Sequence, residues 1–220
     1  RKYAGSIGYS TIYSSLSGAA PVVNNGRLRL MHGTNTFTGT IQVSNGALLG
    51  ATNGSFGNVA NDIVLGATGS FGGLGIQGGS GKRATLDRKV TLAGNGGILV
   101  SGGNAPIGIN GLVTGPGKLI VMTGVANAEG NHGWLYQDND YSGGTLVVSG
   151  SLRPATGSEN KAVFGTGDIR ILNNGVLIIC GSNNVANSAT VLVADQGYGG
   201  GLQFFGAYLP TIDPASFGTL

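Results

Sequence analysis

The stretch Asn35-Thr36-Phe37-Thr38-Gly39-Thr40-Ile41-Gln42-Val43-Ser44-Asn45-Gly46-Ala47-Leu48 returns later in the chain as Asn139-Asp140-Tyr141-Ser142-Gly143-Gly144-Thr145-Leu146-Val147-Val148-Ser149-Gly150-Ser151-Leu152. Each copy has an Asn, an aromatic residue two places on, a hydroxyl residue, a Gly, a run of β-formers, a second Gly and then a Leu. We call these copies the first and second phrase. A repeated strand–turn–strand unit is typical of a chain that stacks similar structural units on one another.

The composition favours many short strands joined by tight turns. Of 220 residues, 44 are Gly, 40% are hydrophobic and 10% are charged. Such low charge argues against disorder, and Gly without a three-residue period excludes collagen. The net charge is +3 and the pI is about 9.1. The basic residues are scattered and no basic run is interleaved with aromatics, so we expect no nucleic-acid partner.

Further features of the sequence restrict the class of protein. The single cysteine, Cys180, lies in an apolar run and is expected to be a small buried hydrophobe. No apolar run approaches the roughly 18 residues of a membrane span, so we expect a segment that is not embedded in a membrane. The chain opens on Arg1-Lys2-Tyr3 without Met or a signal peptide. We therefore expect a processed product or a piece of a longer protein.

Period-2 stretches occur along the whole chain, and no segment holds a helical pattern without an interrupting Gly. Asn-Gly pairs separate these stretches, for example at 25–26, 45–46 and 95–96. Such pairs close hairpins, or turn the chain at the corners of a parallel β-helix. Short strands with regular turns also suit a sandwich. Two longer modules with segments in the same order, about 26–73 and 117–179, favour the β-helix.

These residues carry a family resemblance. Gly-x-Leu-x-Leu at 26–30, the first phrase, and the spacer formed by 86–92 and 115–119 resemble the autotransporter-associated β-strand repeat, also called the passenger-associated transport repeat. The resemblance covers roughly residues 21–205. The second phrase departs from the pattern at Asp140, where a Thr is expected. The family implies a right-handed parallel β-helix exported to the cell surface of a Gram-negative bacterium or a relative, and it implies no single activity.

We therefore predict an all-β, right-handed parallel β-helix with no significant helix. Residues 1–20 form an N-terminal arm or first rung outside the repeat, and 21–220 form one continuous β-helix. At roughly 20 residues per rung, the chain would make about ten rungs. The second module contains an extra segment, 125–138, which we predict to be an inserted loop. Solenoids normally cap their ends, and the uncapped sequence at 215–220 indicates either a cut from a longer passenger or pairing with other subunits.

The candidate contact residues lie in that extra segment and are Trp134, Tyr136 and His132. Trp is favoured where rings stack on sugars or on partners, but Trp134 equally suits a loop anchored against the rod. Asp138 to Gly143 matches the first half of a calcium-binding loop, but Ser149 stands at position 12, where that loop requires Glu. We predict no metal site and no cofactor.

Repeat positions account for the remaining candidates. Asp62 and Asp168 hold equivalent places in the two modules, so they are read as repeat features and not as an acid–base pair. Phe37 and Tyr141 are read as stacked aromatics at equivalent corners. No catalytic residue is predicted, and the chain is not expected to be an enzyme.

The sequence thus favours a structural or adhesive segment of an extracellular or cell-surface β-helix, such as a stalk, fibre or adhesin passenger. One alternative is the subunit of a filament that assembles end to end through β-pairing. Another is a carbohydrate-active β-helix enzyme. The expected partners are other copies of the chain, or surface glycans and host or matrix components.

Overall fold

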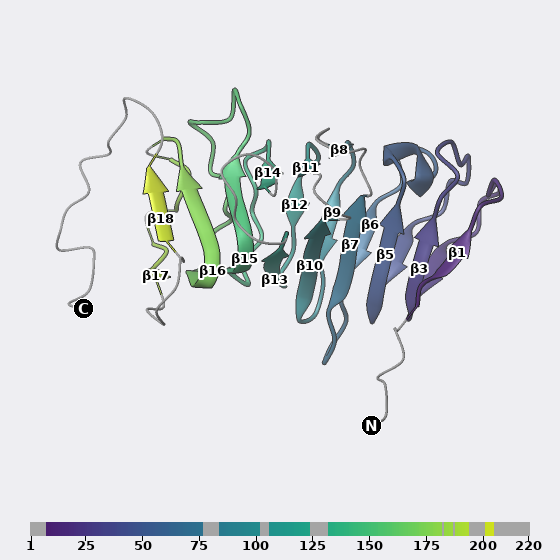
Figure 1. Ribbon diagram of the computed structural model, residues 1–220, viewed down its shortest axis with the longest axis horizontal. Helices are drawn as coiled ribbons and strands as arrows, with labels where there is room; N and C mark the ends of the chain where they lie inside the picture. Colours follow the sequence, from purple (N-terminus) through teal and green to yellow (C-terminus); the bar gives the residue numbers. More distant parts are fainter. Residues whose placement is uncertain are drawn as a thin grey trace.

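A computed structural model gives the fold of this chain and describes residues 8–76, 84–101, 106–123, 132–181, 183–186, 188–193 and 201–204. Parallel strands stack into a β-solenoid of about seven turns, which confirms the predicted parallel β-helix. Figure 1 shows the strands following one another along a rod, with β1 at one end and β18 near the other. The segments 1–7, 125–131 and 215–220, to which some sequence predictions refer, lie outside the described residues.

Each turn has three faces, which we number in the order in which the chain visits them. The strands of the first face pair in parallel, and they are β1 (Ser10–Ile12), β3 (Arg27–Leu30), β5 (Gly46–Gly50), β7 (Gly72–Ile76), β10 (Gly96–Ser101), β13 (Lys118–Met122), the first half of β15 (Thr145–Pro154), the first half of β16 (Ile169–Ile179), and β17 (Val191–Val193).

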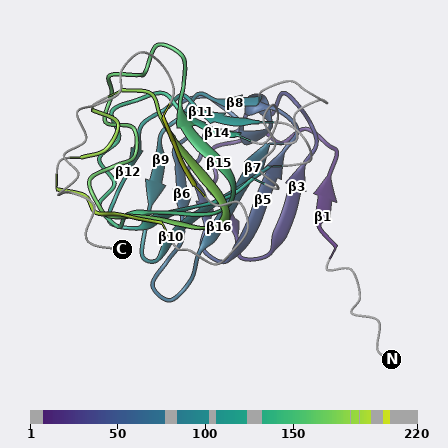
Figure 2. The same ribbon diagram turned by 60° about the vertical axis from the view of Figure 1, so that its left-hand side comes forward.

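The second face changes character along the rod. In the early turns it contains irregular backbone and one short 3-10 helix, η1 (Asn53–Phe56). In the later turns it is a parallel sheet made of β8 (Ala84–Leu86), β11 (Ile107–Ile109), β14 (His132–Leu135), the second halves of β15 and β16, and β18 (Gly201–Phe204). The third face holds β2 (Val22–Asn24), β4 (Ile41–Val43), β6 (Ile63–Leu65), β9 (Val90–Leu92) and β12 (Val113–Thr114). Figure 2 shows the strands of these faces arranged around a common interior.

The core consists of apolar columns that run along the rod axis. On the first face, successive turns place the following residues in register: Leu28, Leu48, Leu74, Leu99, Val121, Val147, Ile171 and Val193. From Leu48 to Val147 these side chains are fully buried. Because each turn buries its apolar side chains against its neighbours, stability comes from the stack and not from single turns.

The stack has about seven turns where about ten were predicted, and the register explains the difference. Partners in the column just described lie 20 to 26 residues apart, for example Leu28 to Leu48 and Leu48 to Leu74. The estimate assumed about 20 residues for every turn. Longer corners, and strands that bend round two faces, use the additional residues.

Two strands pass through a corner without ending. β15 changes register between Val147 and Ser149, and Gly150 has a φ of 74°. A β-bulge bends a strand, and Gly accepts the positive φ without steric cost. β15 and β16 therefore join the first and second faces into one sheet of 13 strands.

The extra segment differs from the predicted loop. Residues 132–135 form β14, which pairs with β11 on one side and with β15 on the other. The segment therefore adds a strand to the second face, and the chain after it lies one face further round the rod. Among the described residues no helix has the length and hydropathy that crossing a membrane requires.

Candidate functional site

The Asn that opens each phrase links its own turn to the turn before it and to the turn after it, and we call this arrangement a clamp. Asn35 Oδ1 accepts a hydrogen bond from the Leu16 amide (2.8 Å), and its Nδ2 donates to the Ser55 carbonyl (2.7 Å). Asn139 does the same between the Val113 amide (2.8 Å) and the Val163 carbonyl (2.7 Å). Both Asn side chains are buried, and these hydrogen bonds satisfy their polar atoms in the interior.

The aromatic residue and the Gly of each phrase are also structural. Phe37 is 2% exposed and Tyr141 is fully buried, so neither ring is available for a ligand. A Cβ on Gly39 would stand 2.2 Å from the Ala20 carbonyl oxygen, and one on Gly143 would stand 2.4 Å from the Gly117 carbonyl carbon. The Gly therefore permits close approach of the turn below.

The two aromatics do not lie at equivalent corners, contrary to the prediction. The first phrase begins on the second face, where the amide of Thr36 donates to the Leu16 carbonyl. The second phrase begins on the third face, where the amide of Asp140 donates to Val113 in β12. β14 causes this shift of one face.

The residues predicted to contact a partner are only partly brought together. His132 and Trp134 both lie on β14, and their rings meet edge to face with centroids 5.7 Å apart. The Arg153 guanidinium stacks over the Trp134 ring, 4.2 Å from its centroid. Tyr136 follows the strand, and its carbonyl accepts hydrogen bonds from Ser158 and Lys161.

Burial limits what this group can do. His132 is 9% exposed and its Nδ1 contacts the Ser151 hydroxyl. Burial, reinforced by the nearby charge of Arg153, lowers the pKa of His132. Cys180 is buried as expected, and burial raises the pKa of its thiol although Arg153 opposes the shift. Trp134 is half-buried beneath Arg153, a contact that fits an anchoring role against the rod.

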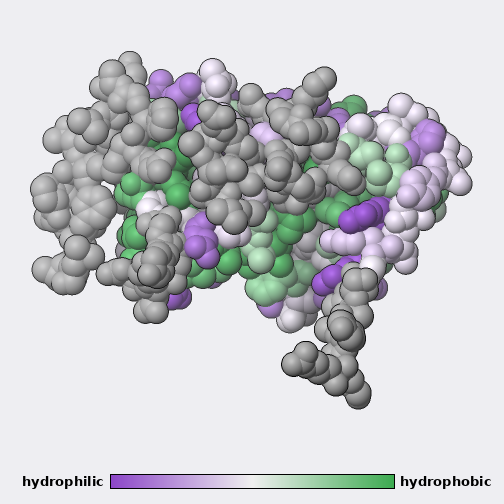
Figure 3. All heavy atoms as spheres, viewed as in Figure 1, coloured by the Kyte–Doolittle hydropathy of each residue, from purple (hydrophilic) through white to green (hydrophobic). Residues whose placement is uncertain are grey.

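The outer surface of the first face is apolar in its middle and basic at both ends. In register, its outward positions include Ala47 on β5, Ile98 on β10, Ile120 on β13 and Leu146 on β15. Figure 3 shows hydrophobic residues along this side of the molecule. Arg27 lies at the β1 end and Arg170 at the opposite end of the same surface.

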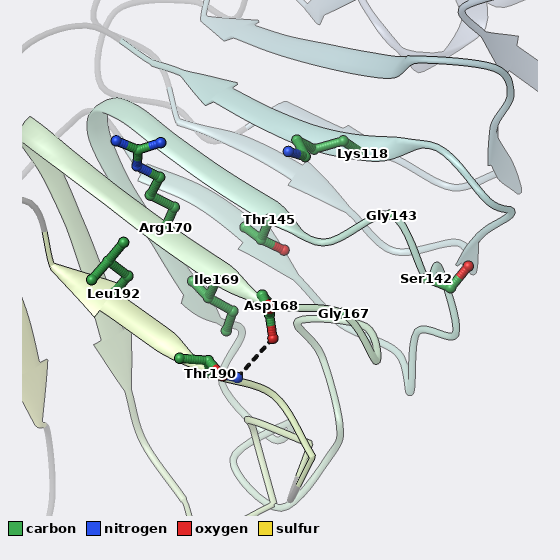
Figure 4. Close-up of a pocket in the computed structure, with 10 residues that line it drawn as sticks. All are labelled: Lys118, Ser142, Gly143, Thr145, Gly167, Asp168, Ile169, Arg170, Thr190 and Leu192. Atoms are coloured by element: carbon green, nitrogen blue, oxygen red, sulfur yellow. Dashed lines mark hydrogen bonds between the residues drawn. The ribbon is translucent and has the colours of Figure 1, made fainter. Parts of the chain in front are cut away.

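A cavity of about 600 Å³ opens at that second basic end. It lies where β13, β15, β16 and β17 begin, so four successive turns contribute to it. Its lining residues are Lys118, Ser142, Gly143, Thr145, Gly167, Asp168, Ile169, Arg170, Thr190 and Leu192. Figure 4 shows Lys118 and Arg170 on one side of the cavity and Asp168 with Thr190 on the other.

The lining combines two exposed cations with one exposed carboxylate and several hydroxyl groups. Asp168 Oδ1 accepts a hydrogen bond from the Thr190 amide (2.9 Å). Within the described ranges the ion pair that the geometry shows is Lys89–Asp62, at 2.5 Å, and it involves neither Lys118 nor Arg170. Among the described residues, neither His nor Cys lines the cavity, and the two exposed cations, Lys118 and Arg170, give it the chemistry to bind an anion.

Sequence reasoning missed this cavity. Lys118 and Arg170 are 52 positions apart in the sequence, and they line the same cavity because they lie two turns apart on the first face. Asp168 was noticed, but only as the equivalent of Asp62. The described part of the chain holds no group of three or more His, Cys, Asp or Glu that could bind a metal.

Comparisons with protein-family models, with curated proteins and with solved structures gave no match for this chain.

Proposed function

We propose that this chain is a rigid structural segment of an extracellular or cell-surface β-helix, with an adhesive outer surface. The observation that carries the proposal is the stack itself: buried apolar columns run through successive turns of the described ranges, and Asn35 and Asn139 each bond to the turns on either side of their own. A stack of this kind resists bending because every turn is hydrogen-bonded to both neighbours. The resemblance to the autotransporter-associated repeat supports export to a bacterial surface.

A filament is the second candidate, and the ends of the stack favour it. In the described residues, β1 and β2 each pair with one strand only, as do β17 and β18. Tyr13 and Val23 are 75% and 62% exposed near one end, and Leu192 is 54% exposed near the other. Unpaired strand edges with exposed apolar side chains are templates for pairing with another chain.

We expect no catalysis. The described cavity contains one carboxylate, Asp168, whereas glycoside hydrolysis typically uses a pair. A carbohydrate-active enzyme therefore remains the weakest of the three candidates.

Electron microscopy and sedimentation of the purified chain test the proposal, together with antibody labelling of intact cells that produce it. We expect separate short rods at all concentrations and labelling without permeabilisation. Rods that join end to end as the concentration rises would replace the proposal with the filament. Labelling only after permeabilisation, or release of reducing ends from a polysaccharide, would overturn it.

A further inference from the structure

The cavity on the first face differs in charge from the equivalent place in the first module. There, the carbonyl of Asp62 accepts from the Ile41 amide, and the Ile63 amide donates to the carbonyl of Lys89. In the cavity, the carbonyl of Asp168 accepts from Thr145, and Ile169 donates to Thr190. Thr190 therefore stands where Lys89 stands in the first module.

This substitution changes the state of the aspartate. Asp62 forms an ion pair with Lys89, so its charge is compensated across one turn. Asp168 receives the Thr190 amide instead, and its carboxylate stays exposed at the cavity. Arg170 likewise stands where the first module has Val64, since each follows the aspartate by two residues. The second module thus places a cation, Arg170, where the first module has an apolar residue, and its aspartate lacks the lysine partner of Asp62.

The positions of the two cations suit an extended ligand. β13 and β16 are both neighbours of β15, so Lys118 and Arg170 are separated by two strand spacings, about 10 Å along the rod axis, and Arg170 lies two residues further along its strand than Asp168, which is in register with Lys118. Arg and Lys bind carboxylate, sulfate or phosphate through charge-assisted hydrogen bonds. One anionic group on each of two linked units could therefore engage both cations.

The remaining lining favours a ligand with hydroxyl groups. The Asp168 carboxylate accepts hydrogen bonds and repels anions, so a purely anionic ligand gains nothing from it. The Ser142 and Thr190 hydroxyls donate and accept, and Leu192 offers an exposed apolar surface. In the described part of the chain no aromatic residue lines the cavity, whereas single-stranded nucleic acids are usually held by base stacking.

We propose that this cavity binds an acidic polysaccharide, with Lys118 and Arg170 contacting its anionic substituents and Asp168 its hydroxyl groups. The inference deepens the proposed adhesive function and rests on it. A carboxylate-bearing chain and a sulfated chain share this chemistry, and the experiment separates them.

Binding of the whole chain to immobilised polygalacturonate, heparin, dextran and polyglutamate tests the proposal. We expect binding to polygalacturonate or heparin that weakens as salt rises, and at least tenfold weaker binding to dextran and polyglutamate. Whichever acidic polysaccharide binds more tightly identifies the substituent. Equal binding of polyglutamate, equal binding of dextran, or no binding to either acidic polysaccharide would overturn the proposal.

Variants assign the binding to the cavity. The pair Lys118→Ser and Arg170→Ser should weaken polysaccharide binding at least tenfold. The pair Arg27→Ser and Arg29→Ser removes the same charge from the other end of the same face and should change binding less than twofold. Asp168→Ala should reduce the preference for polysaccharide over polyglutamate. If the two double variants lost polysaccharide affinity equally, binding would depend on overall charge and not on the cavity, and the site would be refuted.

The rod measurements are independent of this test. Thermal unfolding of each variant confirms that it is folded, and micrographs of the variants should show unchanged rods. If the protein forms rods and is labelled at the cell surface but does not bind acidic polysaccharide, only the proposed ligand is refuted. If the rods or the surface labelling are lost, the proposed function is refuted.

Discussion

The two phrases have similar sequences and share the hydrogen bonds of their opening Asn, yet they occupy different faces of the rod. Ile41–Val43 of the first phrase lies on the third face, whereas the matching Thr145–Val147 of the second lies on the first face. The comparison teaches that a repeat of this kind determines the Asn hydrogen bonds and the turn of the chain. It does not determine which face of the rod the phrase occupies. One inserted strand, β14, moves everything after it by one face.

The clamps provide the largest expected effect. Asn35→Ala and Asn139→Ala each leave one backbone amide and one buried carbonyl without the side-chain partner, so we expect each to lower the free energy of unfolding by about 2–3 kcal/mol. Urea denaturation measures the loss. Amide hydrogen exchange should accelerate at Leu16 in one variant and at Val113 in the other.

The exposed Asn25 gives a matched control, because Asn25→Ala alters an exposed corner and should change stability by less than about 0.5 kcal/mol. A similarly small loss for Asn139→Ala would show that the clamp does not hold the turns together.

A smaller effect distinguishes the two aromatic positions. The Tyr141 hydroxyl bonds to Thr145 Oγ1 at 2.6 Å, and burial raises the pKa of Tyr141 well above its ordinary value. The first phrase has Phe37, with Ile41 where Thr145 would stand. We expect Tyr141→Phe to cost about 1 kcal/mol, because Thr145 keeps the Phe164 carbonyl as a partner.

The reverse change tests the same point in the first phrase. Phe37→Tyr places a hydroxyl in the core opposite an aliphatic side chain and should cost about 1–2 kcal/mol. Thermal unfolding of both variants checks the pair. Stabilisation by Phe37→Tyr would show that the core around position 37 offers the new hydroxyl a hydrogen-bond partner, as Thr145 does for Tyr141.

The smallest expected effect on stability concerns His132 on β14. This strand precedes the second phrase and has no counterpart before the first. In the folded protein, burial and the charge of Arg153 lower the pKa of His132 below the value of about 6.5 that it has in the unfolded chain. Protonation therefore favours unfolding, and stability should fall as the pH drops from 7 to 5. In His132→Gln this part of the pH dependence should be absent. Identical pH profiles for both proteins would contradict the assignment.

Much of the fold was predictable because the repeat, the period-2 strands and the Asn-Gly corners report local geometry. The number of turns was not, because corner length varies and sequence spacing does not show which residues stack. β14 was missed for a related reason. His132-Gly133-Trp134-Leu135 alternates like a strand, but its outward residues are bulky and it lay in a segment without a repeat partner.

The cavity was unpredictable for another reason. Its charged residues come from separate turns, and each is ordinary by itself. Only the register shows that Thr190 replaces Lys89 as the neighbour of the aspartate, and only that comparison exposes Asp168 as different from Asp62.

The clamps also bear on how such a rod would yield to a pulling force. The side chain of Asn139 belongs to one turn but bonds to the turn before and the turn after it, Val113 and Val163. If the turn that contains Val163 detaches, Asn139 loses one of its two hydrogen bonds. Its side chain is then held less firmly to the turn that contains Val113. We therefore expect the rod to peel in steps longer than the 20 to 26 residues of a single turn, so that damage at one end is shared before it spreads.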